Sequence, residues 1–229
     1  MIALVPQIDQ TGGMFVKKVI AVNGSPRRNC NTAELLEHAL RGAKEAGAET
    51  ELVHLYGLIF KGCISCLYCK RKDKEHGTCA MKDELTPVLE RVKEADALLL
   101  GSPIYFMNLS AGMIAFMERL FFSNYIYSNE IPTVFPKPLP NAFLYTMNMT
   151  EEHVKQFGIR ERFAFHEGTA EKILMAKPKI LYAYNTYQFT DYSKYESSIF
   201  DEPEKAAYRK EVFPQQCEEA YRIGKALVT

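Results

Sequence analysis

Four of the six cysteines of this 229-residue chain crowd into one short segment. They are Cys63, Cys66, Cys69 and Cys79. Three thiolates spaced three residues apart can bind one small metal centre from a single loop, and a fourth thiolate nearby can complete the coordination. The compact C-x2-C-x2-C run therefore favours a 4Fe–4S cluster, which takes four cysteine thiolates.

Three other interpretations of this segment stay open. Structural zinc sites usually take two separated pairs of ligands, and three cysteines in seven residues fit that pattern poorly. A redox pair such as Cys63 and Cys66 leaves the other two cysteines unexplained. The thiols could also bind no metal. The charged run KRKDKEHGT between Cys69 and Cys79 predicts an exposed loop, and because a longer loop costs little entropy it is compatible with four-thiolate ligation.

The composition places the chain among ordinary globular proteins. It is 47% hydrophobic and 24% charged, with no net charge, so we expect neither nucleic acid nor an anionic membrane as a partner. No segment is apolar over the length of a bilayer, and the first residues do not resemble a signal peptide. We therefore expect a cytoplasmic protein, in which clustered cysteines indicate metal binding or redox chemistry rather than disulfides.

Strands and helices alternate along the sequence. Apolar runs predict strands at 16–23, 49–55, 95–102, 141–149 and 178–189. Helical patterns lie at 32–47, from Asp83 onward, at 111–122, within 150–176, and at 203–228 with an interruption near Pro214. This alternation predicts an α/β, flavodoxin-like, doubly wound fold: a five-stranded parallel sheet in the order 2-1-3-4-5 with helices on both faces. We expect one domain over 14–229, with a cysteine-rich insert at about 61–82 and an N-terminal extension at 1–13.

In this strand order, the loops that leave strands 1 and 3 flank a crevice at the carboxyl edge of the sheet, where ligands bind. The first loop, GSPRRNCNT, carries the hydroxyls of Ser25 and Thr32, the amide of Asn31 and the cation of Arg27. It ends at a helix N-terminus, which favours an anion. A phosphate monoester would suit this loop. The alternative is a solvated loop with an ordinary helix cap.

The second loop, SPIYFMN, brings apolar and aromatic surface to the same crevice. Pro103 stiffens the loop, and Ile104, Tyr105 and Phe106 offer surface against which a flat heteroaromatic ring could lie. The alternative is that these residues are simply core residues at the end of a strand.

Together these motifs resemble the NADPH-dependent FMN reductase and iron–sulfur flavoprotein family. The resemblance rests on GSPRRNCNT, on GSPIYF, and on the cysteine segment followed by KDEL, and it extends from about Val16 to about Phe122. It implies two cofactors, FMN and a 4Fe–4S cluster. The residues implied at the FMN phosphate are Ser25, Arg27, Asn31 and Thr32. Those implied at the isoalloxazine ring are Pro103, Ile104, Tyr105, Phe106, Thr146, Met147 and Asn148.

The resemblance implies an FMN-dependent oxidoreductase. Electrons would come from NAD(P)H or a reduced carrier and would leave through FMN, and through a 4Fe–4S cluster, to an acceptor. Because the flavin performs the chemistry, no protein side chain is expected to act as a catalytic acid, base or nucleophile. Two alternatives stay open: a flavodoxin-like electron carrier without its own substrate, and a zinc-binding interaction module on the same fold.

Aromatic residues crowd the end of the fifth strand and the segment after the third helix. They include Tyr125, Tyr127, Tyr187, Tyr192 and Tyr195. So many aromatic rings need to be covered, so we expect a homo-oligomer whose interface they line, or in which they cap the flavin of a neighbouring subunit.

Overall fold

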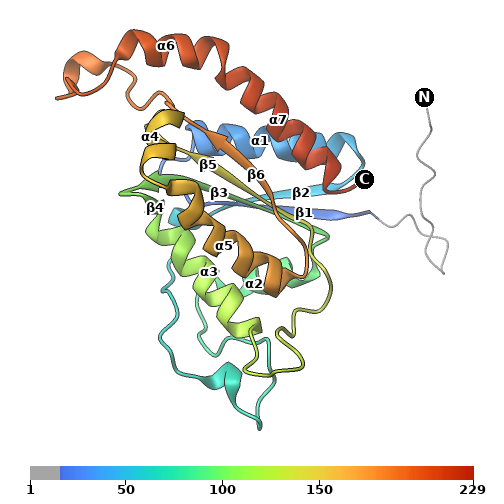
Figure 1. Ribbon diagram of the computed structural model, residues 1–229. Coiled ribbons are helices and arrows are strands. Elements are labelled where there is room, and N and C mark those ends of the chain that lie inside the picture. Colours follow the sequence, from blue (N-terminus) through green and yellow to red (C-terminus); the bar gives the residue numbers. More distant parts are fainter. Residues whose placement is uncertain (1–15) are drawn as a thin grey trace.

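The computed structural model describes residues 16–229 (Figure 1). The predicted extension at 1–13 lies outside the described residues. The strands are β1 (Lys18–Asn23), β2 (Glu49–His54), β3 (Ala97–Tyr105), β4 (Asn108–Leu109), β5 (Asn141–Thr146) and β6 (Lys179–Ala183). The helices are α1 (Asn31–Glu45), α2 (Thr86–Glu94), α3 (Ala111–Asn124), α4 (Glu151–Gln156), α5 (Ile159–Leu174), α6 (Glu202–Glu211) and α7 (Phe213–Ala226).

The sheet has the predicted order. Five parallel strands follow one another as β2-β1-β3-β5-β6, so β5 and β6 are the fourth and fifth strands of the prediction. Val22 of β1 lies beside Val53 of β2 and Leu100 of β3. All three side chains are buried, because helices cover both faces of the sheet and continuous apolar strands suit that environment. The predicted fold class is confirmed.

Two helical layers enclose the sheet (Figure 1). Helices α1 and α7 form one core with one face, and α2, α3 and α5 form a larger core with the other. Helices α1 and α7 approach very closely, since a Cβ on Gly224 would lie 1.8 Å from the Ala39 carbonyl oxygen. Only glycine permits that contact, which fixes the C-terminal helix onto α1.

The segment after β3 differs from the prediction. Strand β3 continues to Tyr105 instead of ending near Ser102, and the chain then reverses through Phe106 and Met107 into the short antiparallel strand β4. Both turn residues have positive φ values, 47° and 61°. Two successive left-handed residues close a tight hairpin. The usual sequence signal is Asn-Gly, so the pair Phe-Met gave no indication of it.

Two helical regions are divided. The region predicted within 150–176 is broken at Gly158, whose φ is 60°. The last region is interrupted at Val212, directly before the pair Phe213-Pro214, so the interruption predicted near Pro214 is confirmed. Among the described residues, no helix combines the length and apolar character needed to cross a membrane.

The cysteine segment connects β2 to α2 with little regular structure. It contains one short 3₁₀ turn, Tyr68–Lys70. In Figure 1 this part of the chain projects beyond the sheet on the side of α3. The helix predicted from Asp83 begins at Thr86, and the Asp83 amide donates to the Thr86 hydroxyl at 3.1 Å.

Candidate functional site

A cavity of about 310 Å³ lies at the carboxyl edge of the sheet, where β1 and β3 end. It is lined by Ser25, Arg27, Cys30, Asn31, Thr32, Pro103, Ile104, Tyr105, Thr146, Met147, Asn148, Thr186 and Gln188. Ten of the eleven residues predicted for the cofactor site are among them. The eleventh, Phe106, lies outside the cavity and is completely exposed at the hairpin tip. A contact between Phe106 and a flavin ring stays a prediction.

The first loop is fixed where it leaves β1. The Gly24 amide donates to the Gly101 carbonyl at 2.8 Å, and the Ser110 hydroxyl donates to the Gly24 carbonyl at 2.6 Å. A Cβ on Gly24 would lie 2.9 Å from the Met113 Cβ, so a larger residue would force the loop away. The loop is therefore held against the end of β3 and the start of α3.

Ser25 and Arg27 form the next part of the wall. The Ser25 amide donates to the Asn23 side-chain oxygen at 2.8 Å, and the Ser25 hydroxyl accepts from the Arg27 amide at 3.2 Å. The Arg27 guanidinium donates to the Gln188 carbonyl at 2.7 Å. Arg27 is the single charged residue among the described residues that line the cavity. The cavity therefore favours an anionic group.

The N-terminus of α1 opens into this cavity without the usual cap. Its N-cap residue, Cys30, makes no side-chain hydrogen bond to the helix, so the first-turn N–H groups keep their capacity to donate. The Asn31 side-chain nitrogen donates to the Tyr187 carbonyl at 2.9 Å, which leaves the backbone N–H groups of the first turn unused. The Thr32 hydroxyl is buried and bonds the Thr146 hydroxyl at 2.7 Å. This arrangement favours an anion site over the alternative of an ordinary helix cap.

The opposite wall contains an unsatisfied acceptor. The Asn148 side-chain nitrogen donates to the Gln188 side-chain oxygen at 2.7 Å, while the Asn148 Oδ1 is buried without a hydrogen-bond partner. A buried acceptor of this kind is costly unless a ligand donates to it. The heteroaromatic ring of a flavin carries such a donor, so this wall fits the group that the sequence predicts.

Two residues of this wall, and one residue buried behind it, were not predicted. Thr186 and Gln188 follow β6 and line the cavity directly. Lys205 of α6 is buried behind it and donates to the Asn148 carbonyl at 2.9 Å and to the Asn185 side-chain oxygen at 2.6 Å. Burial lowers the pKa of Lys205 to about 8. The carboxyl-edge rule indicates the loop after β6, but nothing in the sequence singles out these side chains.

The four cysteines of the insert meet at a second, small cavity. Cys63, Cys66, Cys69 and Cys79 all line it, together with residues of α3 that include Glu118. All four are free thiols. The Cys63 amide donates to a Glu118 carboxylate oxygen at 3.1 Å, which ties the loop to α3. The structure thus brings the four predicted ligands to one place.

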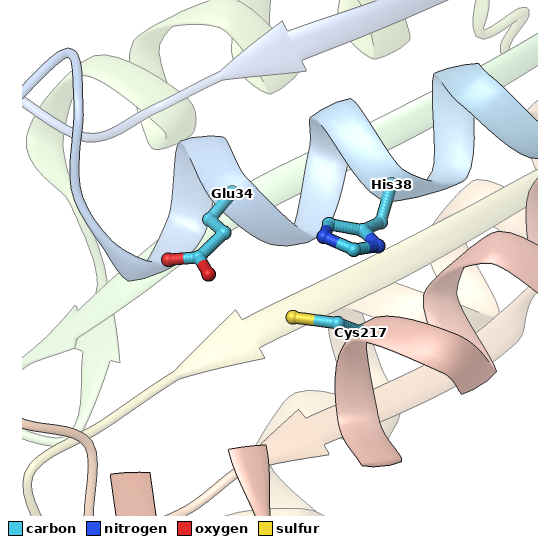
Figure 2. Close-up of side chains that lie close together, drawn as sticks. All are labelled: Glu34, His38 and Cys217. Carbon is cyan, nitrogen blue, oxygen red and sulfur yellow. The ribbon is translucent and has the colours of Figure 1, made fainter. Parts of the chain in front are cut away.

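A third group of ligand-type side chains lies between α1 and α7 (Figure 2). Glu34, His38 and Cys217 present one atom each within 4.8 Å of one another. Two guanidinium groups already hold this cluster: Arg209 pairs with Glu34 at 2.7 Å, and Arg41 donates to the His38 Nδ1 at 3.0 Å. Burial raises the pKa of the Cys217 thiol to about 11. Two adjacent cations and a protonated thiol disfavour a metal ion, so we interpret the cluster as helix packing.

The fold and the two cavities define a flavodoxin-like protein with an anion-accepting site at the strand switch point. A family model described as NADPH-dependent FMN reductase matches residues 17–135, just over half of the chain. The chain therefore belongs to the NADPH-dependent FMN reductase family, as predicted. The description of this family names FMN, the cofactor that the sequence predicts.

Similar proteins include an iron–sulfur flavoprotein of Methanocaldococcus jannaschii, 41% identical over 102 residues, which are 44% of this chain and 51% of that protein. An iron–sulfur flavoprotein of Archaeoglobus fulgidus is 33% identical over 103 residues, 45% of each chain. The match thus spans about half the length of these curated relatives.

Solved structures share the fold over nearly the whole chain. An NAD(P)H:quinone oxidoreductase from Methanothermobacter marburgensis superimposes with a TM-score of 0.67 at 19% identity, covering 94% of this chain and 98% of that one. An FMN-dependent NADH-azoreductase from Bacillus anthracis in complex with FMN gives 0.62 at 12% identity, covering 93% and 100%. At these identities the likeness shows the fold alone.

Proposed function

We propose that this protein is an FMN-dependent oxidoreductase that takes electrons from NAD(P)H or a reduced carrier and passes them to an acceptor. The observation that carries the proposal is the cavity at the strand switch point, where the predicted flavin-site residues meet beside one cation and one open helix N-terminus. FMN supplies hydride and electron transfer when it is bound. The protein supplies the binding and the orientation.

The two ends of the cavity suit the two ends of FMN. Arg27, the hydroxyls of Ser25 and Thr32, and the N-terminus of α1 would hold the phosphate, since these groups are cationic or donate hydrogen bonds. Pro103, Ile104 and Tyr105 would lie against the ring. The Tyr105 hydroxyl is uncharged at physiological pH, and burial raises its pKa further.

We further propose that the four cysteines hold a 4Fe–4S cluster, which would carry single electrons. Zinc fits the ligand pattern less well, because structural zinc sites usually take two separated pairs of ligands, whereas three of these cysteines lie within seven residues.

The proposed oligomer has mixed support. Part of the predicted aromatic surface is covered within the chain: Tyr192 is buried, and the rings of Phe189 and Tyr195 stack with centroids 4.1 Å apart. Tyr127 remains exposed. The homo-oligomer therefore stays a prediction, and a monomeric mass in light scattering at micromolar concentration would contradict it. The cytoplasmic location also stays a prediction.

The decisive experiment is anaerobic purification, followed by a visible spectrum, metal analysis and an assay of NAD(P)H oxidation. We expect bound FMN, about four iron atoms per chain, and steady NAD(P)H oxidation with an added quinone or flavin. A protein that cannot be reconstituted with FMN would refute the flavin site. Zinc in place of iron would favour the interaction module, and a flavoprotein that does not oxidise NAD(P)H would favour the electron carrier.

A further inference from the structure

Arg119 is an arginine in the middle of an apolar helix. It lies in the α3 sequence AFMERLFF, and its side chain has no exposed surface. Among the described residues, it is the largest side chain that is completely buried. A buried guanidinium is unfavourable unless its N–H groups find acceptors. The partners of Arg119 therefore indicate what it does.

All of these partners belong to the two ends of the cysteine segment. Before Cys63, the Lys61 carbonyl accepts from the Arg119 Nη1 at 3.0 Å. After Cys79, the Asp83 carboxylate accepts from Nη1 at 2.8 Å and from Nη2 at 3.3 Å, and the Met81 carbonyl accepts from Nη2 at 3.4 Å. One side chain thus holds the entry and the exit of the segment on α3.

The remaining guanidinium nitrogen is directed at a predicted ligand. The Arg119 Nε donates to the Cys79 Sγ at 3.0 Å. Because arginine stays protonated at any physiological pH, this donor is always present. The position of Cys79 is then set by α3, and the nine residues between Cys69 and Cys79, all exposed or partly exposed except the buried Gly77, do not need to define it. Cys79 can therefore serve as the fourth ligand despite the long gap that separates it from Cys69.

We propose that Arg119 is a positioning residue that closes the cysteine segment onto α3 and, through its hydrogen bond to the Cys79 sulfur, sets the electron affinity of the group held there. The second half of this inference rests on the proposed 4Fe–4S cluster. Hydrogen bonds to cluster sulfurs and nearby positive charge stabilise the more negative, reduced form, and so raise the reduction potential. The first half concerns the protein without any bound group.

Four variants separate the two roles. Arg119→Gln removes the charge and the hydrogen bond to sulfur. Arg119→Lys keeps the charge but cannot reach all the acceptors, so its effect should be intermediate. Asp83→Asn removes the ion pair and leaves the donor to Cys79 in place. Arg91→Gln is the matched control, because Arg91 makes a similar two-pronged contact with Glu51 at an exposed site outside the segment.

The first measurement uses the metal-free protein and the protease Lys-C, which can cut the segment at its lysines. We expect Arg119→Gln and Asp83→Asn to be cut at least tenfold faster than the wild type, and Arg91→Gln to match the wild type. Equal cutting rates in all the proteins would overturn the closing role. This measurement needs neither FMN nor a cluster, so it stands even if the proposed cluster is refuted.

The second measurement is an anaerobic redox titration of the reconstituted proteins, together with the rate of iron loss to a chelator. We expect Arg119→Gln to lose iron about 10–100-fold faster. A tenfold weaker stabilisation of the reduced form would lower the potential by about 59 mV. Asp83→Asn keeps the donor to Cys79 and removes one nearby negative charge, so its potential should not fall below that of the wild type. If Arg119→Gln and Asp83→Asn destabilise the segment equally and neither lowers the potential, Arg119 is merely structural and the electronic role is wrong.

The inference can still be tested if a variant does not fold or if no cluster forms. If Arg119→Gln does not fold, Arg119→Lys still tests the electronic role, and an unchanged potential in that variant would overturn it. If the wild type itself gives no iron–sulfur spectrum, the proposed cluster is refuted and with it the electronic half of the inference. The proteolysis result then decides the closing role alone.

Discussion

The substitution Arg27→Ala tests the flavin site most directly. Arg27 is the only charged side chain among the described residues of the cavity, and it also donates to the Gln188 carbonyl at 2.7 Å. The substitution would therefore remove two contacts. One is a charge-assisted bond to the phosphate of FMN, and the other is the link between the first loop and the loop after β6.

The two losses can be separated by using two ligands. A hydrogen bond to a charged group contributes about 1.5–3 kcal/mol, which corresponds to roughly 10- to 150-fold in Kd. Riboflavin lacks the phosphate, so its affinity reports only the loss of the Gln188 contact, which at this exposed position contributes about 1 kcal/mol or less. We expect Arg27→Ala to weaken FMN at least tenfold more than riboflavin.

The assay is fluorescence titration of the metal-free protein with each flavin, at two salt concentrations. The loss of FMN affinity caused by Arg27→Ala should be smaller at high salt, because salt screens the exposed charge. Arg28→Ala is the matched control, since Arg28 lies against Gly57 and does not line the cavity. Equal weakening of FMN and riboflavin by Arg27→Ala would refute a phosphate contact and leave Arg27 as a link between loops.

Three further predictions concern the rest of the molecule. Thr146→Val should lower the free energy of unfolding by about 1–3 kcal/mol in urea titrations, because it leaves the buried Thr32 hydroxyl without its partner. Burial lowers the pKa of Lys205 to about 8 from an ordinary 10.5. Between these two pH values the unfolded chain binds more protons than the folded chain, so the contribution of Lys205 to the free energy of unfolding rises with pH. Lys205→Met should therefore flatten the rise in the free energy of unfolding between pH 8 and 10. Cys66→Ala should remove most of the iron found by metal analysis, and Cys217→Ala should leave it unchanged.

The sheet could be predicted because the apolar pattern that marks each strand is contained in a short stretch of sequence. Each strand is buried on both faces, so each is a continuous apolar run, and helices between such runs require parallel neighbours. The carboxyl-edge rule then placed the loops after β1, β3 and β5 together. Arg27 and Asn148 lie in the loops after β1 and β5, Tyr105 is the last residue of β3, and all three line the cavity.

The remaining parts of the site depend on contacts between distant residues. Gln188 joins the site through bonds to Arg27 and Asn148, residues 161 and 40 positions away. No local pattern marks such a partner. The hairpin after β3 was missed because Phe106 and Met107 take left-handed conformations that their residue types disfavour. Arg119 was equally hidden, since one charge in an apolar helix can be exposed, buried or part of a site.

Helix α3 connects the two cavities. At its start, the Ser110 hydroxyl accepts from the Met113 amide as the N-cap and donates to the Gly24 carbonyl of the loop after β1, while the Ser110 amide donates to the Ser102 hydroxyl. Two and a half turns later, Arg119 holds the cysteine segment. With a rise of 1.5 Å per residue, the two points lie about 14 Å apart along the axis. Because one continuous helix anchors both, their separation is set by regular secondary structure rather than by the loops, which are free to differ in length. The long Cys69–Cys79 gap is therefore expected to change the exposed edge of the cysteine segment while leaving the distance between the two sites as it is.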